Sequence, residues 1–281
     1  MRLGQIKFES KVTAALFEGP LARPVPGYSL VELIRKAETE SVAVTKLAAE
    51  MASRHPEPAV PVLPINPPEV WACGCTYVRS NGRCQVHLAG APDFYERAFQ
   101  QARPELFFKG TARICVGPGQ PIGIRFDSSF TVPEPALALV LGRKGRILGY
   151  TLGNDVTARD IERENPLYHP QAKTYSGSCA LGPLIVTADE LPDPYQLVLT
   201  CSITRNGAPR FSGTFSTVGL RRTLDVLVEY ALRANPLPAG SVLLTGTGIA
   251  VTEEAALAAG DLVSIRIPQI GELSNPAAIV Q

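Results

Sequence analysis

The feature that most limits the fold of this chain is a succession of short, apolar, β-rich runs between residues 70 and 268. Nearly every run ends in turn-forming residues, and only a few segments of this part favour helices, among them DFYERAFQQA and RRTLDVLVEYALRAN. Such a pattern is typical of a large, mostly antiparallel β-roll or barrel, and it disfavours a doubly wound parallel sheet. The predicted strands are VWACGCTY, ELFFKG, ARICVG, PALALVLG, ILGYTLG, LGPLIVT, LVLTCSITRNG, SVLLTGTGI and DLVSIRIP.

The first 68 residues follow a different pattern, which predicts a small N-terminal α+β domain. MRLGQIKFES and TAALFEG alternate as the two strands of a hairpin would. Ser29 precedes an amphipathic run and Glu32 follows three residues later, which indicates a capping box at a helix start, and VAVTKLAAEMASR favours a second helix. The proline-rich stretch HPEPAVPVLPINPPEV predicts an extended connector. We therefore divide the chain into residues 1–68 and a β-roll catalytic domain, residues 69–281.

Composition and charge narrow the range of partners. Lys and Arg total 27 against 26 for Asp and Glu, so a net charge of +1 gives no electrostatic basis for binding nucleic acid or an anionic membrane. No apolar segment reaches membrane length, and early charged residues interrupt any signal-like run, so we expect a cytoplasmic protein. The six cysteines show no C-x-x-C pair and are expected to be reduced core thiols. A small-molecule substrate is the expected partner.

One carboxylate, Glu134, stands between two prolines at the mouth of the apolar run VPEPALALV. A carboxylate near a core needs a cation, a metal or several hydrogen-bond donors, because desolvating it alone is costly. The partner is expected in residues 149–183, where charged side chains are dense. There Asp155 ends a predicted strand, and Lys173 lies beside apolar and aromatic neighbours that would lower its pKa by partial desolvation.

The remaining charges of this block favour a less specific interpretation. The segment DIERE and the residue before it are expected to form i, i+3 and i, i+4 pairs on a solvated helix face. His169 is expected to have a surface or structural role. The residues of the expected solvated face are Arg159, Asp160, Glu162 and Arg163.

Taken together, these motifs resemble the fumarylacetoacetate hydrolase superfamily, and within it the subgroup of 2-keto-3-deoxy sugar acid (arabinonate) dehydratases. The resemblance covers roughly residues 70–275 and rests on FFKGT, the Pro-Glu-Pro stretch, GYTLGNDVTARDIE, ENPLYHPQAKTYSGSCALGP and LLTGTGI. It implies a β-roll catalytic domain that forms a homodimer or higher homo-oligomer. It also implies a divalent ion, Mg²⁺ or Mn²⁺, held by two glutamates of an E-x-E strand and the aspartate of an Asn-Asp pair.

Mapped onto this sequence, the implied ligands are Glu134 and Asp155, but Ala136 stands where the second glutamate belongs. Residues i and i+2 of a strand project from one face, so both glutamates could reach one ion, whereas alanine offers no donor. We therefore predict a metal site that is incomplete, with binding weak or absent. If no ion binds, the Lys173 ammonium could neutralise the carboxylate pair, which would make Lys173 an acid or oxyanion partner instead of a base.

The resemblance assigns the catalytic acid and base to Glu105 and Lys173. In the implied reaction a 2-keto acid loses a C3 proton, the enolate is stabilised by positive charge, and the C4 hydroxyl is expelled. Less specific interpretations stay open for two of these features. Lys109 could be a solvated surface lysine, and Gly246 and Gly248 could serve only a tight turn. The expected substrate-binding residues are Phe108, Lys109, Thr245, Gly246 and Thr247.

Three functions are compatible with these residues. The first is a lyase-type enzyme that enolises and dehydrates a 2-keto acid or β-dicarbonyl compound. The second is a repurposed, metal-independent isomerase, cyclase or dehydratase of specialised metabolism, and the third is a catalytically silent family member. Residues 76–90, TYVRSNGRCQVHLAG, resemble the family's lid but carry no acidic side chain, which favours natural divergence over an introduced change at Ala136. Retention of Glu105, Asp155 and Lys173 argues against a silent protein.

Overall fold

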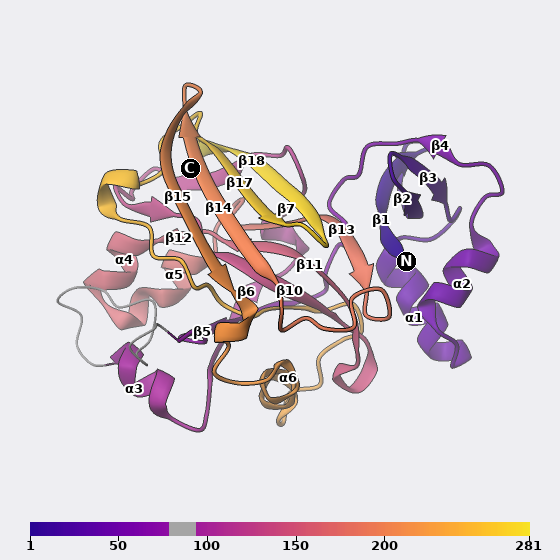
Figure 1. Cartoon of the computed structure of the whole chain (residues 1–281), viewed down its shortest axis with the longest axis horizontal. Helices are drawn as coiled ribbons and strands as arrows, with labels where there is room; N and C mark the ends of the chain where they lie inside the picture. Colours follow the sequence, from indigo (N-terminus) through magenta and orange to yellow (C-terminus); the bar gives the residue numbers. More distant parts are fainter. Residues whose placement is uncertain (79–93) are drawn as a thin grey trace.

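The computed structural model describes residues 1–78 and 94–281, and strands prevail over helices in it (Figure 1). The predicted α+β class, mostly antiparallel with few helices, is confirmed. The expected lid-like segment lies largely outside the described residues. The helices are α1 (Leu30–Glu40), α2 (Val44–Met51), α3 (Phe94–Gln100), α4 (Arg159–Glu164), α5 (His169–Lys173) and α6 (Leu224–Leu232).

The largest sheet has the strand order β4-β3-β2-β1-β13-β11-β10-β16-β5-β6, with β7 paired to β13. Its neighbours are antiparallel except for β16 with β5 and β13 with β7, which run parallel. The strands are β1 (Arg2–Phe8), β2 (Lys11–Glu18), β3 (Leu21–Pro24), β4 (Glu57–Pro58), β5 (Val70–Gly74), β6 (Glu105–Gly110), β7 (Cys115–Val116), β10 (Pro135–Leu141), β11 (Ile147–Asp155), β13 (Cys179–Thr187) and β16 (Val242–Leu244).

Two further sheets complete the fold. One has the order β15-β14-β17-β18-β8, and the other pairs β12 with β9. Three strands of the five-stranded sheet were not predicted. Strand β8 has only four residues, β15 is mostly exposed, and the buried positions of β18 include small and polar side chains, so none of the three shows a long apolar pattern. The strands are β8 (Ile122–Arg125), β9 (Thr131–Val132), β12 (Thr157–Ala158), β14 (Val198–Arg205), β15 (Ala208–Ser216), β17 (Leu262–Ile267) and β18 (Gly271–Val280).

Strand β10 is buried along its whole length because it separates two hydrophobic clusters. Leu137, Leu139 and Leu141 belong to the cluster shared with the five-stranded sheet. Ala136 and Val140 belong to the cluster shared with α1 and α2. The alternation of side chains along a strand explains this division. The strand that directly follows Glu134 is thereby fixed between two cores.

The N-terminal elements gather at one end of the molecule (Figure 1). The predicted hairpin of β1 and β2 is confirmed, as is the capping box of Ser29 and Glu32 at the start of α1. Strand β1 also pairs with β13, so the N-terminal strands extend the sheet that carries the rest of the fold. The division at residue 68 stays a prediction.

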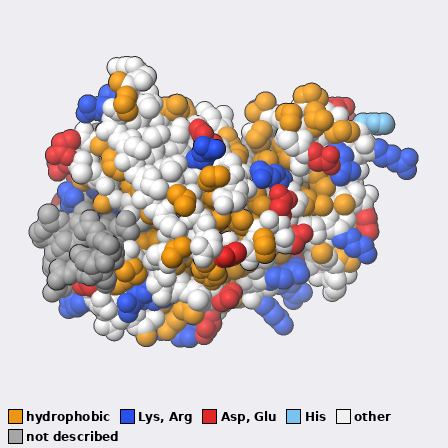
Figure 2. Space-filling view, viewed as in Figure 1, with side chains coloured by type: hydrophobic (Ala, Val, Ile, Leu, Met, Phe, Trp, Pro, Cys, Tyr) orange, Lys and Arg blue, Asp and Glu red, His pale blue; other side chains and the backbone are white. Residues whose placement is uncertain are grey.

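The visible surface carries basic and acidic side chains interspersed (Figure 2), in keeping with the net charge of +1. Within residues 1–78 and 94–281, no helix combines the length and the apolar character that a membrane crossing requires.

Candidate active site

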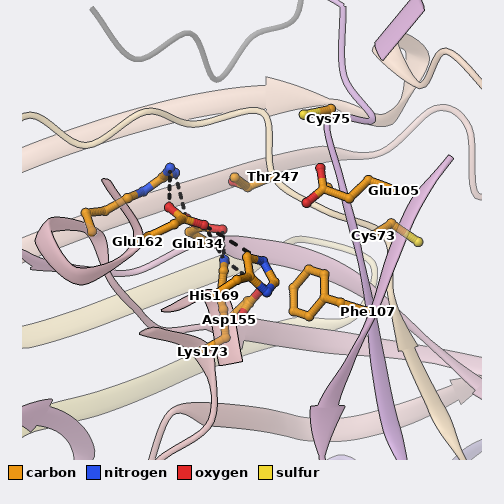
Figure 3. A pocket seen from close by; sticks show the side chains of 12 residues that line it. Cys73, Cys75, Glu105, Phe107, Glu134, Asp155, Glu162, His169, Lys173 and Thr247 are labelled. Atoms are coloured by element: carbon orange, nitrogen blue, oxygen red, sulfur yellow. Dashed lines mark hydrogen bonds and ion pairs between the residues drawn. The ribbon is translucent and has the colours of Figure 1, made fainter. Parts of the chain in front are cut away.

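Four charged residues that the sequence singles out line one cavity (Figure 3), namely Glu105, Glu134, Asp155 and Lys173. Its walls come from β5, β6, the chain just before β10, the end of β11, and the short helices α4 and α5. Segments more than a hundred residues apart therefore meet at one place. The described residues lining it are Cys73, Gly74, Cys75, Glu105, Phe107, Glu134, Asp155, Arg159, Glu162, His169, Lys173 and Thr247.

The Lys173 ammonium lies at the centre of the charged wall and is the partner that Glu134 needs. Its Nζ donates to Glu134 Oε2 at 2.9 Å, to Asp155 Oδ2 at 3.2 Å and to Thr157 Oγ1 at 2.8 Å. An ammonium has three N–H donors, so all three have acceptors. Lys173 ends α5 and its side chain is only 5% exposed.

The backbone around Glu134 and Asp155 brings the two carboxylates together. Strands β10 and β11 are antiparallel, with Pro135 opposite Asn154. Asn154 Oδ1 accepts from the Glu134 amide at 3.0 Å, and the Asp155 amide donates to the Glu134 carbonyl at 2.9 Å. The Asn-Asp pair thus holds one carboxylate through its asparagine and supplies the other through its aspartate.

Two more cations complete the cluster. Arg159 Nη2 lies 2.6 Å from Glu134 Oε1, and Arg159 Nη1 lies 3.1 Å from Glu162 Oε2. Lys109 Nζ lies 2.6 Å from Asp155 Oδ1 and donates to the Val156 carbonyl at 3.1 Å. The contacts to Glu134 Oε1 and Asp155 Oδ1 lack hydrogen-bond geometry, so we regard them as ionic.

This cluster corrects two expectations from the sequence. Lys109 is fully buried, so the interpretation as a solvated lysine is wrong. Arg159 and Glu162 form the expected i, i+3 pair, but their side chains are each only 6% exposed, so the expected solvated face is wrong at these two residues. The formal charges of three cations and three carboxylates cancel within the cluster: Lys109, Arg159 and Lys173 against Glu134, Asp155 and Glu162.

The pKa shifts follow from the same contacts. Burial alone would raise the pKa of Asp155, but the charges of Lys109 and Lys173 hold it below its usual value. Burial alone would lower the pKa of Lys173, but Asp155, then Glu134 and Glu162, hold it well above its usual value. The expected lowering of the Lys173 pKa is therefore wrong, because the carboxylates outweigh desolvation. Lys173 is an ammonium ion at neutral pH.

The donor set does not fit a tightly held hard divalent cation. Ala136 brings no oxygen ligand, and its side chain packs in the core cluster with Val140. Both oxygens of Glu134 and both of Asp155 already contact lysine or arginine nitrogens. Within the part of the chain that the structure describes, no three His, Cys, Asp or Glu side chains gather as a metal-ion site. An ion at Glu134 and Asp155 would have to displace Lys173 from both.

Glu105, a predicted catalytic residue, does reach the cavity from β6 (Figure 3). Gly74 lies opposite Glu105 in the pairing of β5 with β6. A Cβ atom on residue 74 would collide with the Glu105 carboxylate, so this glycine makes room for it.

The predicted substrate-binding residues are brought together only in part. Thr247 lines the cavity, and Gly246 has a φ of +87°, which a glycine adopts without strain. Thr245 is fully buried, and its Oγ1 donates to the Leu137 carbonyl at 2.9 Å. Lys109 contacts Asp155 from within the core and is not among the described lining residues.

The structure corrects the choice of Phe108. Its side chain is 46% exposed and packs edge-on against Trp71, with ring centroids 5.8 Å apart. Its neighbour Phe107 lines the cavity instead, because successive side chains of β6 point to opposite faces.

His169 also lines this cavity, so the expected surface location is wrong, whereas the alternative of a structural role stays a prediction. Its ring packs edge-on against Phe107, with centroids 4.4 Å apart, and its Nε2 lies 4.0 Å from Glu162 Oε1. The one sequence signal for this position was its spacing of four residues from Lys173, which places both side chains on one face of a helix.

The fold and this cavity define a known class of protein. The sequence matches the family model described as fumarylacetoacetate hydrolase, C-terminal, over residues 69–278, and the chain therefore belongs to the fumarylacetoacetate hydrolase family. The resemblance drawn from the motifs is thereby confirmed.

Individual relatives are dehydratases. The chain is 45% identical over 216 residues to the 2-dehydro-3-deoxy-D-arabinonate dehydratase of Saccharolobus solfataricus, which covers 76% of this chain and 72% of the relative. It is 40% identical over 260 residues to a probable 2-keto-3-deoxyxylonate dehydratase of Haloferax volcanii, which covers 89% and 88%. A solved 2-keto-3-deoxy-D-arabinonate dehydratase, complexed with magnesium and 2,5-dioxopentanoate, matches with a TM-score of 0.82 and 35% identity over the whole of both chains. The chain is an enzyme of this family.

Proposed function

We propose that the chain is a dehydratase-type lyase that removes water from a 2-keto-3-deoxy sugar acid by way of an enolate. The observation that carries the proposal is the placement of the Lys173 ammonium in the wall of a cavity that Glu105 also enters. The similarity to dehydratases over most of the chain supports the same reaction class.

Positive charge at the cavity wall is what the enolate requires. Removing a proton next to a ketone places negative charge on the C2 oxygen, and a preorganised cation in a water-poor site stabilises that charge strongly. Lys173 holds its charge in place because Glu134, Asp155 and Thr157 fix its position. Glu105, which lines the cavity from the strand β6, is the proposed acid that protonates the departing C4 hydroxyl.

The metal requirement of this chain is proposed to be weak or absent. With Ala136 in place of a ligand and Lys173 between the remaining two carboxylates, the ammonium takes the position between Glu134 and Asp155 that the family resemblance gives to Mg²⁺ or Mn²⁺. No step of the proposed reaction passes through a metal ion.

The test is turnover of a panel of 2-keto-3-deoxy pentonates and hexonates in the presence of EDTA, with loss of one water detected by mass spectrometry. We expect dehydration of at least one member, little affected by EDTA. Glu105→Gln and Lys173→Ala should each lower the rate by roughly 10²-fold or more. Failure to dehydrate any member would refute the proposed function, and an isomerised or cyclised product would favour the alternative of a repurposed enzyme.

Three predictions rest on the sequence and the resemblance alone. These are a homodimer or higher homo-oligomer, a cytoplasmic location, and a separate domain at residues 1–68. Sedimentation, cell fractionation and limited proteolysis, respectively, test them.

A further inference from the structure

The proposed reaction lacks a proton acceptor if Lys173 is an ammonium ion. Its three N–H groups bond to Glu134, Asp155 and Thr157, so its nitrogen has no lone pair to offer. Arg159 is likewise a cation, paired with Glu134 and Glu162. The base that removes the C3 proton must therefore be another side chain of the cavity.

We infer that His169 is this base, an inference that rests on the proposed function. His169 lines the cavity and its side chain is 25% exposed, so a substrate can touch it. The distance from its Nε2 to Glu162 Oε1 is 4.0 Å, which is beyond a hydrogen bond. Glu162 is already paired with Arg159, so His169 lies at the edge of the ionic cluster and outside its hydrogen bonds.

The location of His169 suits proton removal at C3 of the proposed substrate. His169 and Lys173 are four residues apart at the two ends of α5, and Figure 3 shows both side chains at one side of the cavity, with Glu105 extending from β6. A substrate whose C2 oxygen faces Lys173 has its C3 one bond further on, beside His169. Its C4 hydroxyl then lies further from Lys173, toward Glu105.

The surroundings of His169 keep a lone pair available. Burial, and then the charge of Lys173 on the same helix, lower the pKa of the imidazole, while Glu162 on α4, Glu105 on β6 and Asp155 on β11 oppose the shift. The net pKa lies below the usual value, so the ring is neutral at pH 7. Phe107 packs edge-on against the ring and limits its rotation. Burial also raises the pKa of the Cys73 thiol, which stays protonated and is no competing base.

The step balances without a further reactant. His169 takes the C3 proton, the C–H electron pair forms the C2–C3 double bond, and the carbonyl pair moves to the C2 oxygen. The enolate then re-forms the carbonyl, a C3–C4 double bond forms, and the C4–O bond breaks as Glu105 gives its proton to the leaving hydroxyl. Water departs, and transfer of one proton from His169 to Glu105 through solvent restores both groups.

The experiment separates proton removal from dehydration. The probe is 2-oxopentanoate, which has C3 protons but no C4 hydroxyl, in D₂O, with exchange at C3 measured by NMR. We expect His169→Gln to slow both this exchange and dehydration by about 10²-fold or more, and Glu105→Gln to slow dehydration but keep exchange. His55→Gln is the matched control, because His55 is exposed and should leave both rates unchanged.

A pH profile excludes a merely structural role. Wild-type exchange should rise through one ionisation below the usual range of histidine, and this ionisation should vanish in His169→Gln; His169→Asn is made alongside in case one variant folds poorly. A C3 exchange rate within about threefold of wild type in either folded His169 variant would overturn the inference. Loss of C3 exchange in Glu105→Gln would instead assign the base to Glu105. A third outcome separates the two proposals. If the wild type dehydrates no sugar acid but exchanges its C3 protons, and His169→Gln loses that exchange, the proposed function is refuted and His169 remains the base.

Discussion

Replacing Lys173 by methionine tests the ionic cluster through stability. The substitution keeps most of the side-chain volume and removes the cation that joins Glu134 to Asp155. Breaking a buried ion pair by removing one partner costs about 3–5 kcal/mol, because the other charge stays buried. Each carboxylate here keeps one further cation, Arg159 at 2.6 Å or Lys109 at 2.6 Å. We therefore expect the lower end, about 3 kcal/mol, or a Tm lower by roughly 5–10 °C.

The pH dependence of this loss has a definite sign. The Asp155 pKa is lowered in the folded protein, so its stabilisation is present above the unfolded carboxyl pKa and is lost as pH falls through the folded value. The Lys173 pKa is raised, so its stabilisation is present below the unfolded lysine pKa and is lost only as pH rises through the folded value. Both are complete at pH 7. The difference between wild type and Lys173→Met should thus be largest near neutrality and shrink as pH falls below about 4, the ordinary carboxyl value.

Thermal unfolding followed by circular dichroism between about pH 2.5 and pH 8 measures this difference. Lys36→Met is the matched control, because Lys36 pairs with Glu40 on an exposed helix face, where such pairs add little stability. A Tm of Lys173→Met within about 1 °C of wild type at pH 7, or a deficit that grows toward pH 4, would refute the cluster as we describe it.

Three further predictions concern the same site. Ala136→Glu should bind Mg²⁺ in a calorimetric titration, because it restores the missing carboxylate. The wild type and the control Ala136→Gln, which has the same shape as the glutamate variant but no charge, should show no tight binding. Tight binding to the wild type would contradict the incomplete metal site. Gly74→Ala should lower turnover at least about tenfold, because the added methyl group collides with the Glu105 carboxylate, and unchanged kinetics would remove Glu105 from the proposed position. Arg159→Met should cost about 3 kcal/mol in a denaturant titration, because it leaves Glu162 without its 3.1 Å partner; a surface-like cost near zero would mean that this pair is solvated.

Local signals in the sequence predicted what depends on neighbours along the chain. The capping box at Ser29 and Glu32 requires only four residues, and the apolar run after Glu134 indicates a buried strand without reference to the rest of the fold. Three strands of the five-stranded sheet, β8, β15 and β18, were missed because β8 is short, β15 is mostly exposed, and β18 buries small and polar side chains, so none has a long apolar pattern of its own.

Site residues that belong to recognisable sequence motifs were predicted. Residues whose burial or orientation depends on contacts with distant parts of the chain were missed. Arg159 and Glu162 have the spacing of a surface ion pair, and their burial depends on Glu134, which is distant in sequence. His169 enters the cavity because it packs on Phe107, about sixty residues earlier. The two adjacent phenylalanines of β6 could not be assigned to a face, because a run without alternation does not fix which side is buried.

The Lys173 ammonium lies between Glu134 and Asp155, and we propose that it leaves no position there for a divalent ion. A crystal soaked in Mn²⁺, with data collected at the manganese absorption edge, tests this directly. The account predicts no anomalous peak between the two carboxylates and a Lys173 nitrogen in contact with both. An anomalous peak at that position, with Lys173 turned away, would contradict it.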